Sequence, residues 1–286
     1  MSNSSVIVVP IEKVSTIPGD TTEISIVPAD DMLAVEEPLE IRIAFGPEGD
    51  RNQKNISVTM CTPGHDFELA AGFLFTEGII TGKEDILSIR FASGAQPSDR
   101  VVVVELKPGI IFDPQKTERH FYTSSSCGVC GKSSISAVRN RIPLFENREE
   151  ISVTASLLNS LPVLLRKRQE VFEHTGGLHA SALFSSAGQL SSCREDVGRH
   201  NALDKLIGAA LLNGDIPLQQ QILLLSGRAS FELLQKAAMA GIRIIAAVGA
   251  PSSLAVEIAG ELDITLVGFL RDNRFNIYSG QKRIQL

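Results

Sequence analysis

Two cysteines lie close together near the middle of the chain, in the segment Thr123-Ser-Ser-Ser-Cys127-Gly-Val-Cys130-Gly131. Cysteines with this spacing serve as half of a structural zinc site, as a dithiol redox centre, or as a nucleophile with a helper. A structural zinc needs four ligands, and neither Cys61, Cys193 nor any histidine forms a second close pair. A thioredoxin-like pair would begin a helix after the first strand of a βαβ unit, whereas this pair follows a Ser-rich stretch.

The third chemistry is the transfer of sulfur itself. A thiolate at Cys127 can accept a sulfur atom and hold it as a persulfide. Cys130 can then attack the inner sulfur, form a disulfide and expel the outer sulfur, or it can tune its neighbour. Gly128 and Gly131 loosen the backbone, so the loop can move between a donor and an acceptor. We therefore predict that Cys127 and Cys130 are the catalytic residues.

Composition limits the partners and the compartment. The formal net charge is -6 and no long run of Lys or Arg occurs, which argues against duplex DNA as the main partner. No apolar run is long enough to span a bilayer, and Met1 to Pro10 lacks the positive region of a signal peptide. We expect a cytoplasmic protein that does not bind a membrane. The remaining cysteines, Cys61 and Cys193, are predicted to be core or near-core thiols.

The elements that must position the cysteine pair follow from the hydrophobic pattern. Alternating apolar residues predict strands near 24–26, 39–43 and 56–58, and a further strand is predicted over 101–106. Thr62-Pro63 is expected to open a helix that continues to Leu74. These elements divide the first half into a flexible leader (1–20), a β-rich N-terminal portion (21–122) and a mobile cysteine loop (123–135).

Residues 136–286 are predicted to form an α/β cofactor-binding domain. It begins with a helix within 156–173, whose regular part is expected to start at Pro162, and a strand pair over 179–185 and 189–194. A helix over 196–212 follows. Short apolar strands then alternate with helices: strands 222–225, 242–248 and 264–269, helices 231–240 and 252–262. This alternation predicts parallel strands in a sheet that is covered on both faces.

Several motifs of the chain resemble those of the formate dehydrogenase accessory sulfurtransferase family, FdhD. They occur in order from about residue 30 to the C-terminus: Ser126–Gly131, Thr175–Ala180, Glu195–Lys205, Ser226–Arg228 and Gly268–Tyr278. The resemblance implies a cytidine-deaminase-like layered α/β fold and a homodimer. It also implies that Cys127 is the persulfide carrier.

The same resemblance names the donor, the acceptor and a binding segment. Sulfur would pass from a cysteine desulfurase to the molybdenum or tungsten cofactor that carries two pterin guanine dinucleotides, before its insertion into formate dehydrogenase. This bis-(molybdopterin guanine dinucleotide) cofactor would be a bound acceptor, and no tightly held metal is expected. The segment that matches the family's cofactor contact is Phe269, Leu270, Arg271, Asp272, Asn273 and Arg274.

The histidine of the second motif has to be tested against deaminase chemistry because of the implied fold. A zinc deaminase requires His-x-Glu followed by Pro-Cys-x-x-Cys. Here Ser181 stands two residues after His179, and the cysteine pair precedes the histidine. The chain therefore lacks the residues that catalysis by a zinc deaminase requires. His179 is either a structural residue or a cofactor-binding residue of the cleft.

Two further groups are candidates for binding the cofactor. Ser226, Gly227 and Arg228 lie between a strand's carboxyl end and a helix start, which is a natural phosphate cradle or an ordinary cap. His200 is placed four residues from both Asp196, the expected N-cap, and Asp204. These three residues either form surface ion pairs or present His200 to the cofactor.

Two other functions compete with sulfur transfer. A non-catalytic chaperone would shield the molybdenum cofactor and deliver it, and it would not need Cys127. A zinc deaminase or structural zinc protein would retain stoichiometric zinc after purification.

Overall fold

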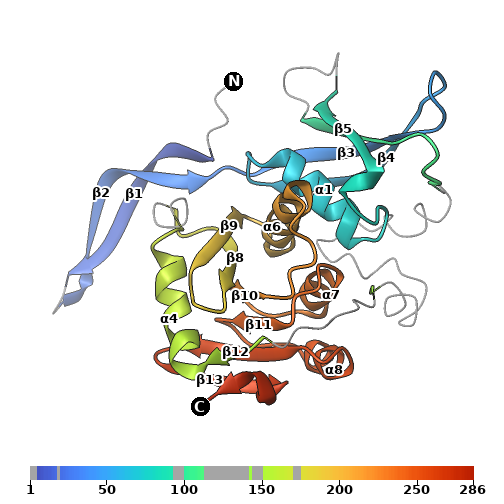
Figure 1. The fold of residues 1–286 in the computed structure, drawn as a ribbon. Helices are drawn as coiled ribbons and strands as arrows, with labels where there is room; N and C mark the ends of the chain where they lie inside the picture. Colours follow the sequence, from blue (N-terminus) through green and yellow to red (C-terminus); the bar gives the residue numbers. More distant parts are fainter. Residues whose placement is uncertain (1–4, 18–19, 93–99, 113–141, 144–150, 170–174) are drawn as a thin grey trace.

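The computed structural model describes residues 5–17, 20–92, 100–112, 142–143, 151–169 and 175–286. The predicted cysteine loop, with Cys127 and Cys130, lies outside these described residues. The described chain forms a layered α/β body, a smaller β-rich portion beside it and a long ribbon that projects from it (Figure 1).

A six-stranded sheet is the centre of the body, with strand order β13-β12-β11-β10-β8-β9. Its three central strands β10 to β12 are parallel, as predicted, and the other strands are antiparallel to their neighbours. The strands are β8 (His179–Ser185), β9 (Leu190–Asp196), β10 (Gln221–Leu225), β11 (Ile244–Ala247), β12 (Thr265–Arg271) and β13 (Arg274–Ser279).

Helices cover both faces of this sheet. Alternate residues of β10 belong to two different cores: Leu223 and Leu225 pack with α6 (Arg199–Asn213), α7 (Phe231–Met239) and α8 (Ser253–Glu261), and Ile222 and Leu224 pack on the side of α4 (Ala155–Arg166). The predicted layered α/β class is confirmed.

Helix α4 begins earlier than expected. Thr154 caps it by accepting a hydrogen bond from the amide of Leu157, so Pro162 lies inside the helix and not at its start. The prediction that the regular part begins at Pro162 is wrong. An interior proline removes one backbone donor, and the buried residues Leu158, Leu161 and Leu165 hold the helix on the sheet despite this loss.

The N-terminal portion is a four-stranded sheet with order β4-β3-β6-β5. Its strands are β3 (Glu37–Phe45), β4 (Asn52–Cys61), β5 (Ile86–Phe91), which the sequence did not predict, and β6 (Val101–Leu106). Helix α1 (Asp66–Thr76) packs between this sheet and α6, and it starts later than Thr62. Short elements complete the fold: β7 (Val153–Thr154), β14 (Ile284–Gln285) and 3-10 turns at Lys83–Asp85 and Gln281–Arg283.

Strands β1 (Val6–Ile17) and β2 (Asp20–Ala34) pair with each other in an antiparallel ribbon. A flexible leader was expected over residues 1–20, and this expectation is wrong for the residues of β1. Pro10 and the polar residues suggested a loop. In a two-stranded ribbon, however, each strand has an outer edge where the missing donor of a proline does no harm.

Candidate functional site

A pocket of about 770 Å³ opens where the carboxyl ends of the parallel strands meet the C-terminal half of α4. Strand β8 begins at the same edge because it runs antiparallel to β10. Fourteen residues line the pocket: Pro162, Val163, Leu165, Arg166, Lys167, Gln169, Gly176, Gly177, Leu178, His179, Ser226, Val248, Arg271 and Asp272. Four candidate binding residues are therefore brought together here: His179, Ser226, Arg271 and Asp272.

Ser226 fixes the floor of the pocket. Its amide donates to the Ala180 carbonyl (3.0 Å), and its Oγ accepts from the Ala180 amide (2.8 Å), so the end of β10 is tied to the start of β8. The His179 ring packs against Gly227, where an added Cβ would lie 3.2 Å from its Nδ1. A side chain at position 227 would push this imidazole from its place.

The pKa of His179 is lowered because burial disfavours the charged ring and Arg199 repels a proton, with a smaller opposing effect of Asp196. The imidazole at the pocket wall is therefore neutral at neutral pH. A neutral ring can donate a hydrogen bond through one nitrogen and accept one through the other.

The turn after β11, at Gly249, is hydrogen-bonded through its backbone to the turn after β10, at Gly227. The amide of Gly249 donates to the Gly227 carbonyl (2.9 Å), and the Gly249 carbonyl accepts from the amide of Phe269 (3.0 Å). A Cβ at Gly249 would come within 3.0 Å of both the Gly227 carbonyl and the Arg228 amide. Glycine is required at both turns for this close approach, so the ends of β10, β11 and β12 form one rigid edge.

The segment from Phe269 to Arg274 is the end of β12 and the tight turn into β13. Phe269, Asp272 and Asn273 have positive φ angles of 54°, 53° and 56°. The strand pairing shifts between Gly268 and Arg271. Residues in such sparsely populated conformations cluster at ligand sites, where the surrounding structure holds them in place.

The side chains of this turn point to different places: the pocket, the core and the solvent. Arg271 and Asp272 reach the pocket, whereas the Leu270 side chain is buried in the core on the α4 side. Phe269 is half-buried, and Asn273 and Arg274 are exposed beyond the pocket lining. The six residues that the resemblance implies for cofactor contact therefore do not all face one cavity.

The charge of the pocket favours an anion. Arg166, Lys167 and Arg271 line it, against the single carboxylate of Asp272. The two residues from α4 were not predicted from the sequence. Basic residues in the last turn of a helix are common because they interact well with its dipole, so their position alone gives no signal for binding.

His200 lies outside the pocket lining, between the starts of α6 and α7. Its Nε2 is 3.5 Å from Ser230 Oγ and 4.0 Å from Glu232 Oε2. Burial, together with the charges of Lys236 and Arg199, lowers the pKa of His200 to about 4, although Glu232 and Glu77 act in the opposite direction. The ring is therefore neutral at neutral pH.

Asp196 does not share a helix face with His200, contrary to our expectation, because it precedes α6. Asp196 is the last residue of β9, and Gly198 is the N-cap of α6. The Asp196 carboxylate forms a buried ion pair with Lys205 (2.7 Å) and accepts hydrogen bonds from the backbone amides of Gly198 and Thr62. The expected N-cap role and the alternative of surface ion pairs are both wrong for Asp196.

Asp204 forms a second buried ion pair, in which its Oδ2 lies 2.9 Å from Lys236 Nζ. Thr76 Oγ1 donates to the same carboxylate over 2.7 Å, and Glu77 completes the cluster 3.2 Å from Lys236. The two ion pairs therefore join α6 to the end of β9 and to α7, and their hydrogen bonds reach the end of α1 and the residue after β4. Most of the motif from Glu195 to Lys205 consequently holds helices together.

Cys61 is buried and Cys193 is half-buried. Burial is the main cause that raises the pKa of Cys61 to about 11 and that of Cys193 to about 12. Neither thiol is a nucleophile at neutral pH, in agreement with their prediction as core or near-core thiols. Within the described ranges, no group of three or more His, Cys, Asp or Glu side chains could hold a metal ion.

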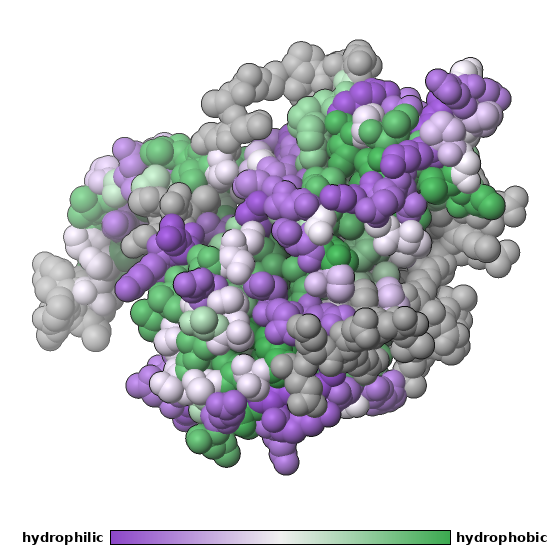
Figure 2. All heavy atoms as spheres, in the orientation of Figure 1, coloured by the Kyte–Doolittle hydropathy of each residue, from purple (hydrophilic) through white to green (hydrophobic). Residues whose placement is uncertain are grey.

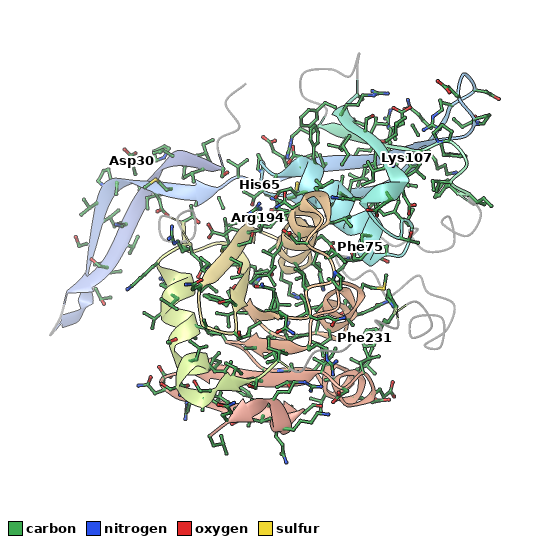
Figure 3. The ribbon with its side chains drawn as sticks, viewed as in Figure 1. Asp30, His65, Phe75, Lys107, Arg194 and Phe231 are labelled. Carbon is green, nitrogen blue, oxygen red and sulfur yellow. The ribbon has the colours of Figure 1, made fainter. Side chains whose placement is uncertain are left out.

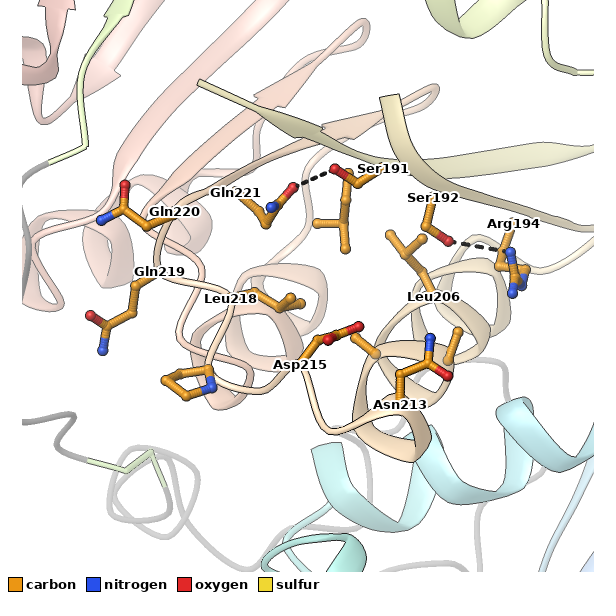
Figure 4. A pocket seen from close by; sticks show the side chains of 14 residues that line it. Ser191, Ser192, Arg194, Leu206, Asn213, Asp215, Leu218, Gln219, Gln220 and Gln221 are labelled. Carbon is orange, nitrogen blue, oxygen red and sulfur yellow. Dashed lines mark hydrogen bonds between the residues drawn. The ribbon is translucent and has the colours of Figure 1, made fainter. Parts of the chain in front are cut away.

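A second pocket, of about 780 Å³, lies at the opposite end of the sheet (Figure 4). It is polar, and its wall includes Asn213, Asp215 and Gln219 to Gln221. Two hydrogen bonds cross its rim, from Ser191 to Gln221 and from Arg194 to Ser192. None of the candidate site residues is among the described residues that line it, so the first pocket is the better candidate.

The model of the FdhD/NarQ family matches residues 34–285. The chain belongs to this family. Proteins named sulfur carrier protein FdhD are similar over nearly their whole length. The one from Streptomyces coelicolor is 51% identical over 262 residues, which are 90% of each chain. The one from Thermoplasma volcanium is 42% identical over 260 residues, covering 90% of this chain and 91% of the relative.

A solved structure confirms the fold. The crystal structure of a candidate formate dehydrogenase accessory protein from Desulfotalea psychrophila has a TM-score of 0.71 and 24% sequence identity, and the match covers 97% of this chain and 99% of that one. The three motifs that contribute to the pocket and the Cys127-x-x-Cys130 segment fall inside the family match. No helix of the described part is long and apolar enough to cross a membrane.

Proposed function

We propose that this protein is a sulfur carrier that supports formate dehydrogenase, and that Cys127 is the residue that carries the transferred sulfur atom. One observation carries the proposal: the FdhD/NarQ match includes Cys127 and Cys130, and full-length relatives are named sulfur carrier proteins. The described cysteines are unsuitable for this role, because burial raises the pKa of both Cys61 and Cys193. The exchange therefore falls to the pair at 127 and 130.

The loading step needs no external oxidant. The Cys127 thiolate attacks the outer sulfur of a persulfide on a cysteine desulfurase, and the desulfurase cysteine leaves as a thiolate. Cys130 then attacks the inner sulfur of the Cys127 persulfide. A disulfide forms and the outer sulfur leaves as hydrosulfide, so two electrons pass from the two thiols to the transferred atom. A thiol reductant must restore the pair before the next cycle.

The acceptor is the guanine dinucleotide form of the molybdenum cofactor, which we place at the pocket beside α4. A volume of about 770 Å³ fits one nucleotide end, and Arg166, Lys167 and Arg271 supply positive charge for its phosphates. His179 offers a neutral donor or acceptor to the ligand. Ser226 and Gly227 hold that wall, the exposed Arg228 follows directly after Gly227, and His200 lies beside Ser230 at the start of α7.

The proposed reaction involves three partners in the cytoplasm: a cysteine desulfurase, the cofactor and formate dehydrogenase. A homodimer is the proposed state of the carrier. The metal of the cofactor is cargo for the dehydrogenase and not a resident group of this chain.

Replacing Cys127 by Ala separates a sulfur carrier from a cofactor chaperone. Cells that contain only the Cys127→Ala chain should make formate dehydrogenase that holds the cofactor but has less than about 1% of its activity, since the acceptor lacks the transferred sulfur. The control is Cys193→Ala, which removes a thiol that stays protonated. Active dehydrogenase from the Cys127→Ala cells would contradict the proposal and indicate a chaperone.

A further inference from the structure

The side-chain amide of Gln169 is buried without a hydrogen-bond partner. Gln169 follows the C-terminal end of α4, and only 5% of its surface is exposed. Its Nε2 is enclosed, and no atom of the described chain accepts a hydrogen bond from it. A buried donor that gives up its bonds to water and gains none destabilises the folded state, so native proteins contain few of them. The unpaired amide of Gln169 therefore requires an explanation.

The position of Gln169 distinguishes it from the other unpaired atoms. Within the described ranges, four more buried side-chain atoms lack a partner: Arg51 Nε, Asn159 Oδ1, Arg199 Nε and Arg243 Nε. None of these four residues lines either of the two pockets described above, whereas Gln169 lines the pocket beside α4. A ligand bound in that pocket can supply the acceptor that the chain itself does not provide.

We propose that Gln169 binds the base of the guanine nucleotide, through the edge that carries O6 and the N1 proton. This inference rests on the proposed function, because it takes the pocket beside α4 as the site of the cofactor. A glutamine amide has an NH2 donor and a carbonyl acceptor. The guanine edge has the complementary pair, an acceptor at O6 and a donor at N1, so two parallel hydrogen bonds can form.

The depth of the pocket separates the base from the phosphates. The three cationic residues of its lining are exposed, whereas Gln169, Leu165 and Leu178 are buried. Hydrophilic side chains lie beside hydrophobic ones at the surface over α4 (Figure 2). Burial costs a charged phosphate far more hydration energy than it costs a neutral base. The phosphates therefore belong with the exposed cations, and the base belongs in the buried part with Gln169.

The amide of Gln169 can turn toward a ligand without breaking any contact. The last torsion of a glutamine side chain is broad and nearly twofold, so a half-turn exchanges the NH2 and the carbonyl group without changing the shape of the side chain. The backbone amide of Gln169 donates to the Arg166 carbonyl (3.3 Å) and holds the residue at the end of the helix. A fixed backbone thus presents an amide that is free to bind.

Gln169→Met tests the proposal, because methionine has a similar length and no amide. With guanosine diphosphate as the probe, we expect this variant of the full chain to show a dissociation constant about 10- to 100-fold higher than the wild type, since two hydrogen bonds are lost in a buried site. Isothermal titration calorimetry measures the constant. Gln219→Met is the matched control: Gln219 is 9% exposed and lines the second pocket. It should bind the nucleotide as the wild type does.

A ligand without the recognised edge shows whether Gln169 contacts the base. The analogue 2-aminopurine riboside 5′-diphosphate lacks both O6 and the N1 proton of guanine. The wild type should bind it about 10- to 100-fold more weakly than guanosine diphosphate, whereas Gln169→Met should bind the two ligands equally within about threefold. A general disturbance of the pocket would weaken both ligands alike and keep the preference.

Urea denaturation of the ligand-free protein separates binding from a structural role. Because the Gln169 side chain has no hydrogen bond to lose, Gln169→Met should unfold at the same urea concentration as the wild type or at a higher one. A lower midpoint with the preference for guanosine diphosphate retained would assign Gln169 a structural role and overturn the proposal. Equal affinity of Gln169→Met and the wild type for guanosine diphosphate would also overturn it.

Sulfur loading is measured separately by mass spectrometry. Gln169→Met should gain a sulfur atom at Cys127 as the wild type does, because loading does not use the pocket. A wild type that gains sulfur but binds no guanosine diphosphate would overturn the inference about Gln169 and leave Cys127 as the carrier. A wild type that binds the nucleotide through Gln169 but gains no sulfur would support this inference and contradict the proposed sulfur transfer.

Discussion

At the residue scale, the pocket wall combines a neutral imidazole with cationic side chains. His179 is uncharged because it is buried near Arg199, and Arg271 stands at the same cavity. A pyrophosphate needs positive charge, whereas the edge of a guanine base needs neutral donors and acceptors. The two kinds of group therefore suit the two parts of a guanine nucleotide.

Removing Arg271 should weaken binding of a guanine nucleotide. With guanosine diphosphate as the probe, we expect Arg271→Ala to raise the dissociation constant about 10- to 100-fold, the usual effect of losing charged hydrogen bonds. Isothermal titration calorimetry measures this constant. Lys107→Ala is the control because Lys107 is exposed in the N-terminal portion, far from α4 (Figure 3). Equal affinity of both variants would exclude Arg271 from the site.

His200 should titrate near pH 4. Its folded pKa is lowered to about 4, against about 6.5 for an ordinary histidine. The unfolded chain therefore binds the proton first, and stability that is fully present above pH 6.5 is lost as the pH falls toward 4. NMR titration of the ring measures the pKa directly. A value above 6 would show that the ring is not enclosed between α6 and α7.

His200→Gln gives the matching stability measurement. Between pH 6.5 and 4, the free energy of unfolding should decrease less steeply with falling pH in this variant than in the wild type. The two slopes should differ by at most the slope expected for the binding of one proton. Urea denaturation at several pH values gives this slope.

The sequence predicted some site residues better than others. Arg271 and Asp272 were found through the resemblance to the FdhD family, and Ser226 was found because it lies between a strand end and a helix start. His179 was left as either a structural or a cofactor-binding residue. Arg166 and Lys167 were missed, since helix-end cations have a common structural cause. Asp196 was misplaced because its four-residue spacing from His200 suggests one helix, although the helix begins only at Arg199.

At the element scale, the crossing of α1 and α6 depends on two glycines. A Cβ at Gly72 would overlap the Asp204 carbonyl, and a Cβ at Gly208 would overlap the Glu68 carbonyl. The two backbones thus touch where these helices cross. The buried ion pair of Asp196 and Lys205 and that of Asp204 and Lys236 fix the same helix from other sides.

Gly208→Ala should destabilise the protein by about 1–3 kcal/mol or more, because the helices must move apart to admit a methyl group. Urea denaturation gives the free energy of unfolding. Gly260→Ala in α8 is the control: its Cβ would meet nothing within 4 Å, and alanine favours a helix, so a gain of about 0.5–1 kcal/mol is expected. A neutral Gly208→Ala would contradict the close crossing.

Elements were predictable where one local rule decided them. Strands β10 to β12 have apolar runs between helices, which is typical of parallel strands covered on both faces. The ribbon was not predictable, because a proline such as Pro10 is tolerated in a strand at the edge of a sheet, and the sequence alone does not show that β1 has such an edge. Pro162 misled in the same way, since tertiary burial of α4 outweighs its missing donor.

At the scale of the whole molecule, the proposed acceptor site lies at a rigid sheet edge, and the cysteines proposed to carry the sulfur belong to a separate part of the chain. The described residues build the pocket, the helix contacts and the ribbon. The cysteine loop at 123–135, which the sequence singled out first, lies outside these residues. The role of the cysteines therefore has to be tested by a reaction of the full-length chain in solution.

The most direct measurement is mass spectrometry of the intact, full-length chain after incubation with a cysteine desulfurase and cysteine. We predict a gain of one sulfur atom, located on the peptide that contains Cys127, absent from the Cys127→Ala chain and retained in the Cys193→Ala chain. A chain that gains no sulfur, or that gains it on a peptide other than that of Cys127, would contradict the assignment of this protein as a persulfide carrier.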